Sequence, residues 1–247
     1  MSNLSTLIWR EIRAYFYSPI AYIVLAVTLL MNGWTFWILI NALNNPGLQL
    51  TGNVMQLFFG GTFFFWFTML LVTPVLTMRL LSEEKRSGSI ELLMTAPVTD
   101  LEVVLGKFFA SWLFFILMWV PTVLYVLILR QYSSIDMGPI FSGYLGTVLV
   151  GGLFLSVGVL ASAMTSNQII AAVVSFAILL FLFSIGVLDL FFNDSFLKKV
   201  IEYLNILDQF GDFAKGILDT RRWVYYASLT VLNLFLSTRI LESRRWR

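Results

Sequence analysis

Long apolar stretches separated by short polar segments dominate the chain. No Asp, Glu, Lys or Arg lies between Arg13 and Arg79, and a second long gap separates Asp136 from Asp189. A membrane-spanning helix needs about 20 mostly apolar residues, so each gap has room for two spans. Two shorter apolar stretches add one span each, and all six must be helices because lipid offers the backbone no other hydrogen-bond partner. The predicted spans are residues 20–40, 57–78, 108–129, 141–164, 169–188 and 223–238.

Residues 3–17 predict a further, amphipathic helix before the first span. Leucine, isoleucine and aromatic side chains share one helical face, and Arg10 and Arg13 lie away from it. This pattern is typical of a helix that lies in the membrane interface. Ser18-Pro19 ends it, because the residue before a proline avoids the α conformation. The alternative is that the first span simply begins early.

Residues 189–222 form a second amphipathic segment, before the last span. Apolar side chains recur at helical spacing from Leu197 to Phe213, with charged residues between them. The spacing predicts one or two short helices at or in the outer face of the membrane. Asp194 or Ser195 is predicted to cap the first of them.

The composition of the 247 residues agrees with a membrane protein. Hydrophobic residues make up 59% and charged residues 12%, against about 25% charged in an average soluble domain. The chain has no Cys and no His, which excludes disulfides, thiol catalysis, and the commonest general base and zinc ligand. The net charge of +2 gives no basic surface for nucleic acid, and we expect no catalytic, cofactor-binding or metal-binding residues in this chain.

The distribution of basic residues predicts the orientation. Six spans place both termini on one side, and that side holds ten of the sixteen Lys and Arg residues. Because cytoplasmic loops carry an excess of Lys and Arg, we expect cytoplasmic N- and C-termini.

The cytoplasmic loop at residues 79–107 contains several signals that end or start helices, which a simple turn would not need. Gly88 is predicted to end the helix that leaves the second span. The next stretch, 90–95, has room for one or two helical turns, and Pro97 stops it. Thr99 and Glu102 match a capping box that starts the third span. The loop therefore predicts a short helix parallel to the membrane between two sharp turns; the alternative is a solvated charged turn.

These residues resemble a known family. The run Glu83-Glu84-x-x-x-Gly88-x-x-Glu91-Leu92-Leu93, followed by Ala96-Pro97 and Gly106-Lys107, resembles the cytoplasmic signature of ABC-2 type transporter permeases. The likeness extends to the interfacial helix, the six spans and the short outer helices. Within the family the chain is similar to permeases of gliding motility and of copper-enzyme maturation.

The resemblance implies a fold, a location and partners. Residues 1–247 would form one all-α transmembrane domain in a bacterial inner membrane, and a second permease half, identical or related, would complete the pore. Two copies of a separate ATP-binding subunit would supply ATP and Mg²⁺, since this chain has no phosphate-binding Gly-x-x-x-x-Gly-Lys-[Ser/Thr] loop. In that motif Leu101 stands where the first glycine belongs, and Phe108 follows Lys107.

The resemblance also implies that residues 90–95 are the coupling helix, on which the ATP-binding subunit docks. We expect charged residues of the loop to pair with that subunit, apolar residues to fill the centre of the contact, and rigid turns to carry motion into the spans. The expected contact residues are Glu83, Glu84, Arg86, Gly88, Ile90, Glu91, Leu93, Met94 and Pro97.

Three functions are compatible with this pattern. The first is the permease half of an ATP-driven transporter, most simply an exporter. The second is an ATP-driven mechanical component of a periplasmic or motility machine, with the outer amphipathic segment as a dock for a periplasmic partner. The third is an ATP-independent transporter, which would need ionisable residues inside the spans, and the predicted spans contain none.

Overall fold

The fold is that of a helical membrane protein. The computed structural model describes residues 3–44, 54–89, 98–132, 135–188 and 203–243. Within these ranges there is no strand, and six helical segments are long and apolar enough to cross a membrane. The prediction of an all-α integral membrane protein with six spans is therefore confirmed.

The helices follow the predicted spans closely. In chain order they are α1 (Asn3–Tyr17), α2 (Pro19–Leu43), α3 (Val54–Gln56), the π-helical turn η1 (Leu57–Gly61), α4 (Phe63–Thr77), α5 (Ser82–Ser87), α7 (Asp100–Trp119), the 3₁₀ turn η2 (Val120–Thr122), α8 (Val123–Tyr132), α9 (Met137–Met164), α10 (Gln168–Leu188), α12 (Ile206–Ala214) and α13 (Thr220–Glu242).

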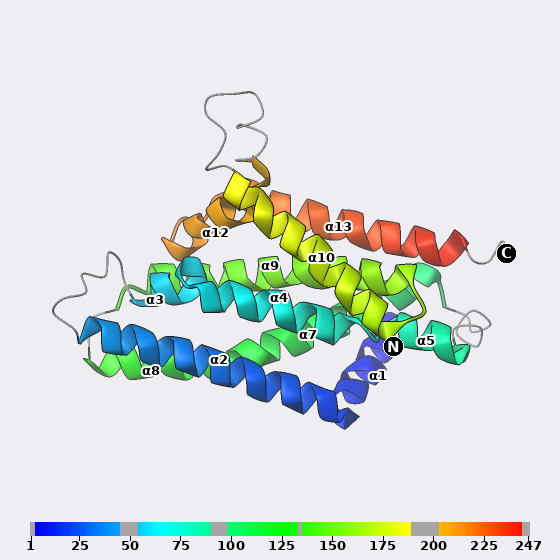
Figure 1. Ribbon diagram of the computed structural model, residues 1–247, viewed down its shortest axis with the longest axis horizontal. Helices are drawn as coiled ribbons and strands as arrows, with labels where there is room; N and C mark the ends of the chain where they lie inside the picture. Colours follow the sequence, from blue (N-terminus) through cyan, green and yellow to red (C-terminus); the bar gives the residue numbers. More distant parts are fainter. Residues whose placement is uncertain (1–2, 45–53, 90–97, 133–134, 189–202, 244–247) are drawn as a thin grey trace.

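Helix α9 is the centre of the bundle. It runs between α13, α10, α4 and α7 (Figure 1), and 78% of its most apolar stretch is buried, against 17% for α10. Small residues make this possible. A side chain at Gly158 would overlap Thr77 of α4, and one at Gly151 would overlap Phe115 of α7. The glycines of the fourth span therefore serve close helix packing.

Two spans differ from their predicted outlines. Helix α4 begins at Phe63, not at residue 57, because the backbone turns at Gly60 (φ +79°). The third span starts at Asp100 and is broken at Pro121 into α7, η2 and α8. Proline lacks the N–H that would continue the helical hydrogen bonds, which explains the break.

The outer amphipathic segment lies inside the fold rather than upon it. Asn205 caps α12 through its side chain, and Phe210 and Phe213 are fully buried against α9 and η1. The hydroxyl groups of Tyr225 and Tyr226 at the start of α13 donate to backbone oxygens just before and in α12. The apolar face of α12 is thus covered by its own chain. The predicted caps Asp194 and Ser195 lie outside the described residues.

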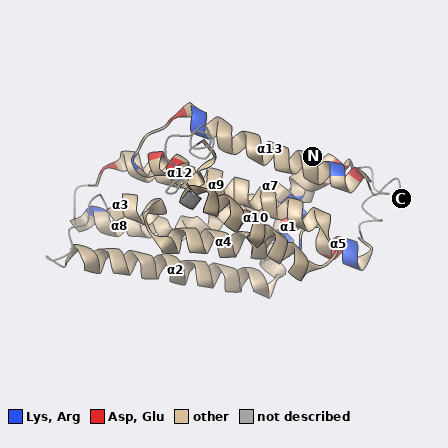
Figure 2. Cartoon of the chain, turned by 45° about the horizontal axis from the view of Figure 1, so that its top comes forward, with Lys and Arg blue, Asp and Glu red and all other residues tan. Residues whose placement is uncertain are grey.

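The two ends of the bundle are distinct. Helix α1, α5 and the last turn of α13 lie at one end, which we call the terminal end, and α3 and α12 lie toward the other (Figure 1). Charged residues lie mainly at these two ends, with few along the bundle between them (Figure 2). Both termini therefore leave from the same side of the bundle.

Candidate functional site

The chain leaves the second span at the terminal end through a tightly held turn. After α4 the backbone turns at residues 78–81 and continues as α5. The hydroxyl oxygen of Ser162, on α9, accepts hydrogen bonds from the backbone N–H groups of Leu81 and Ser82, both at 3.0 Å. Lys85 donates to the backbone oxygen of Ala163 on the same helix. The start of α5 is therefore anchored on the most buried span.

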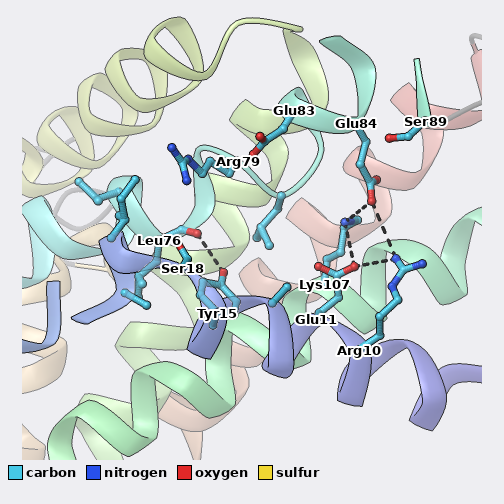
Figure 3. A pocket seen from close by; sticks show the side chains of 15 residues that line it. Arg10, Glu11, Tyr15, Ser18, Leu76, Arg79, Glu83, Glu84, Ser89 and Lys107 are labelled. Carbon is cyan, nitrogen blue, oxygen red and sulfur yellow. Dashed lines mark hydrogen bonds and ion pairs between the residues drawn. The ribbon is translucent and has the colours of Figure 1, made fainter. Parts of the chain in front are cut away.

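The inner side of α5 is joined to two further helices by ion pairs. Lys107 of α7 places its ammonium nitrogen 2.7 Å from a carboxylate oxygen of Glu84 and 3.3 Å from one of Glu11 on α1. Arg10 lies 2.7 Å from the same oxygen of Glu11. Only 4% of the Lys107 side chain is exposed, with 17% for Glu84 and 13% for Glu11. We call Arg10, Glu11, Glu84 and Lys107 the Lys107 cluster (Figure 3).

The positive charges of the cluster favour the ionised form of Glu11. Burial by itself raises the pKa of the Glu11 carboxyl group. The nearby Lys107 ammonium and Arg10 guanidinium outweigh this effect, so the pKa of Glu11 lies below its usual value of 4.5. At neutral pH Glu11 is therefore a carboxylate and forms ion pairs with Lys107 of α7 and with Arg10.

Helix α1 is fastened to the spans along its apolar stripe. The Leu7 side chain packs against Gly106, and the Tyr15 ring stacks on Phe114 with ring centres 4.9 Å apart. The Tyr15 hydroxyl donates to the backbone oxygen of Leu76 at 2.9 Å. The prediction that α1 is a separate helix is confirmed, and much of the face expected to meet lipid meets α7 instead.

The predicted turns on both sides of the loop are present. Gly88 ends α5 in the left-handed conformation (φ +73°), which glycine adopts without strain. The capping box is complete: Thr99 accepts from the Glu102 N–H, and the Glu102 carboxylate accepts from the Thr99 N–H at 2.8 Å. The described residues on both sides of this segment therefore have the predicted conformations.

The expected contact residues divide into three groups. Glu83, Arg86 and Gly88 are exposed at the terminal end. Glu84 points inward, and its carboxylate pairs with Lys107. The others lie outside the described residues: Ile90, Glu91, Leu93, Met94 and Pro97.

Sequence reasoning missed the rest of the Lys107 cluster. Lys107 entered only as part of a motif, and Glu11 was not singled out. One signal was available, because Glu11 follows Leu7 by four residues and precedes Tyr15 by four. It therefore lies on the apolar stripe of α1, where a charge requires a buried partner.

Comparisons with known proteins identify the family. A comparison with curated protein sequences finds no match. A family model described as "ABC-2 family transporter protein" matches residues 41–207, which include α5, the loop to α7 and the start of α12. This range covers about two thirds of the chain. The chain therefore belongs to the ABC-2 family of transporter proteins and is a multi-pass transmembrane permease component, not the ATPase.

Proposed function

We propose that this chain is the membrane half of an ATP-driven exporter whose power comes from a separate ATP-binding subunit docked at the terminal end. The observation that carries the proposal is the fastening of α5. A segment that receives force can drive the spans only if it is rigidly joined to them, and α5 is joined to α9 by Ser162 and to α7 and α1 by the Lys107 cluster.

In this proposal the loop binds the ATP-binding subunit and transmits its motion to the spans. Arg86 is exposed on α5, a few residues before 90–95 in the sequence, so it is available for a charge pair with the ATP-binding subunit. Ile90, Leu93 and Met94 would fill the apolar centre of that contact, where binding energy is usually concentrated. The turns at Gly88 and Thr99 then transmit the motion into α5 and α7. Glu84 contributes indirectly, because its ion pair with Lys107 holds α5 in position against α7.

The assembly we propose has four protein subunits. Two ATP-binding subunits, which hold ATP and Mg²⁺, drive two six-span halves in a bacterial inner membrane. The second half is another copy of this chain or a related one. The terminal end, with its larger share of Lys and Arg, faces the cytoplasm.

The fold favours export over a role as a docking component for a periplasmic machine. A docking role would require the amphipathic segment at residues 189–222 to expose an apolar face to a periplasmic partner. The described part of that segment, α12, has its apolar side chains Phe210 and Phe213 inside the bundle. An ATP-independent mechanism finds no support in the charge distribution, since the charged residues lie mainly at the two ends of the bundle (Figure 2).

Charge reversal in the loop tests the proposal. We expect Glu91→Arg to leave membrane insertion intact, and to lower transport-coupled ATP hydrolysis of the reconstituted complex by about tenfold, because one charged contact is replaced by a repulsive one. Glu242→Arg is the matched control, since it reverses a partly exposed glutamate at the same end but outside the loop. Normal coupling in Glu91→Arg, with the subunit still bound, would contradict the assignment.

A further inference from the structure

A cavity of about 690 Å³ lies at the terminal end, between α1, the first turn of α2, the end of α4 and α5. This volume falls in the range of about 300–1,000 Å³ that is typical of small-molecule sites. The Tyr15 hydroxyl, bonded to the Leu76 backbone oxygen, closes one side, and the Lys107 cluster closes another (Figure 3). Stable contacts therefore define its walls.

The lining has an apolar part and a charged part. The apolar part belongs to helix segments at the boundary of the spans, and its residues are Ala14, Ile20, Ala21, Val75, Leu76 and Leu80. The charged part lies beyond it, on α1, on residues 79–84 and at Lys107 of α7 (Figure 3). A ligand that fits both parts has an apolar end toward the membrane core and a charged end toward the terminal side, as a phospholipid does.

Two of the lining charges remain available to such a ligand. Arg10, Glu11, Glu84 and Lys107 neutralise one another. In the chain as described, no ion pair includes Arg79 or Glu83, and the Arg79 side chain uses its Nε–H for Gln168 at 3.2 Å. A guanidinium group has five N–H donors, so its terminal nitrogens are left for another acceptor.

The pairing of these two charges selects the headgroup. Arg79 and Glu83 lie one helical turn apart in sequence, and both line the cavity. A headgroup with a phosphate beside a primary ammonium group would satisfy both, with the phosphate on the arginine and the ammonium on the glutamate. A purely anionic headgroup would leave Glu83 facing a like charge, and a quaternary ammonium has no N–H to donate to it.

We propose that this cavity binds one zwitterionic aminophospholipid, with its phosphate on Arg79, its ammonium on Glu83 and the start of an acyl chain along α2 and α4. The lipid would sit between α1 and the end of α4, and so beside the joint that holds α5. The proposal concerns this chain alone and does not depend on the ATP-binding subunit.

Lipid retention tests the site. The full chain would be purified from nanodiscs with equal amounts of phosphatidylethanolamine, phosphatidylglycerol and phosphatidylcholine of matched acyl chains, and its bound lipid measured by native mass spectrometry. We expect one phosphatidylethanolamine per chain, preferred about tenfold over each of the other two lipids, as expected for a charge-assisted contact. Equal retention of the three lipids, or a preference for phosphatidylglycerol, would overturn the proposal.

Variants distinguish the site from general lipid contact. Arg79→Gln should lower phosphatidylethanolamine retention about tenfold, and Glu83→Gln should reduce its preference over phosphatidylglycerol. Ala14→Phe should lower retention by filling the cavity without removing a charge. Arg239→Gln and Glu242→Gln, an exposed pair at the same end outside the cavity, should change nothing. Wild-type retention in both Arg79→Gln and Ala14→Phe would refute the site.

The same headgroup could come from a membrane phospholipid or from a soluble phosphate ester, and a soluble competitor distinguishes the two. We expect free glycerophosphoethanolamine at the lipid's concentration to leave the bound phosphatidylethanolamine in place, because it lacks the acyl chain for the apolar part of the cavity. Its displacement of the lipid at that concentration would show that the ligand is a soluble phosphate ester and would refute the lipid assignment.

Discussion

Lys107 brings a full positive charge into a place where solvent reaches almost none of its side chain. A buried charge is tolerated only with charged partners, and the two carboxylates that it meets come from α1 and α5. The same side chain that costs desolvation energy thus fixes the relative positions of three helices. Ser162 also fixes the position of a helix, because its neutral hydrogen bonds hold the start of α5 on α9.

Removing this ammonium should destabilise the protein. In Lys107→Met the carboxylates of Glu84 and Glu11 stay buried near each other without their common cation, and such a loss costs about 3 kcal/mol. We expect a lower melting temperature in detergent, and a partial recovery when Glu84→Gln is added. Arg239→Met is the control, because its exposed pair with Glu242 is worth about 1 kcal/mol or less. A Lys107→Met protein as stable as the wild type would show that the cluster does not hold the terminal end.

Glu11 makes stability depend on pH. Burial raises its pKa, but Lys107 and Arg10 together hold it below 4.5, so folding favours the ionised form. The stabilisation is present above the unfolded pKa and is lost as the pH falls below about 4.5 toward the folded pKa. We expect Glu11→Gln to show a smaller loss of melting temperature than the wild type when both are acidified from pH 6 to pH 3. Parallel losses in the two proteins would contradict this role.

Helix α9 shows how glycine positions decide which helices meet. Without a driving force from water, membrane helices associate through close packing of small residues. Gly158 brings α9 against Thr77 of α4, and Gly151 brings it against Phe115 of α7. Asn233 of α13 adds a hydrogen bond to Ser156 of α9 at 3.1 Å. The resulting contacts join the span that anchors α5 to the rest of the bundle.

A larger residue at the closest of these contacts should separate the helices. A Cβ at position 158 would lie 2.7 Å from the Thr77 Cβ, and overpacking of this kind typically costs about 1–3 kcal/mol. We expect Gly158→Val to lower the melting temperature and to weaken coupling of ATP hydrolysis to transport. Gly211→Ala in α12 is the control, since nothing lies within 4 Å of its added Cβ; it should be neutral or slightly stabilising. Equal melting temperatures for the two variants would argue against the close contact.

The assembled molecule has two charged ends and an apolar length between them, as a protein that spans a membrane requires. Both termini and α5 belong to the terminal end (Figure 1). The arrangement places α1 and α5 at one end of the bundle and α12 toward the other (Figure 1).

The absence of cysteine from the chain makes this topology simple to measure. Single cysteines at Thr6 and Ser243 would mark the terminal end, and one at Lys215 would mark the opposite end; all three positions are exposed. In intact cells we expect an impermeant maleimide to label Lys215→Cys, and to label the other two only after the membrane is opened. Labelling of Thr6→Cys from outside would invert the proposed orientation.

Local features of the chain are visible in its sequence because neighbouring residues produce them. The apolar stretches predicted six helices, Ser18-Pro19 separated α1 from α2, and Thr99 with Glu102 marked the start of α7. The kink at Gly60 and the break at Pro121 altered the outlines of two spans. The first depends on Phe210, which packs against Gly60 from far along the chain, so the local pattern of apolar residues did not reveal it.

Hydropathy and capping thus determine the membrane class, the number of spans and the turns that bound the loop, because each depends on residues within a few positions of one another. The pairing of Lys107 with Glu84 and Glu11 joins residues 23 and 96 positions apart, and the insertion of α12 and the cavity beside Arg79 likewise combine distant segments. These features follow from how helices pack in three dimensions, where charge pairing and shape select partners that no local pattern specifies.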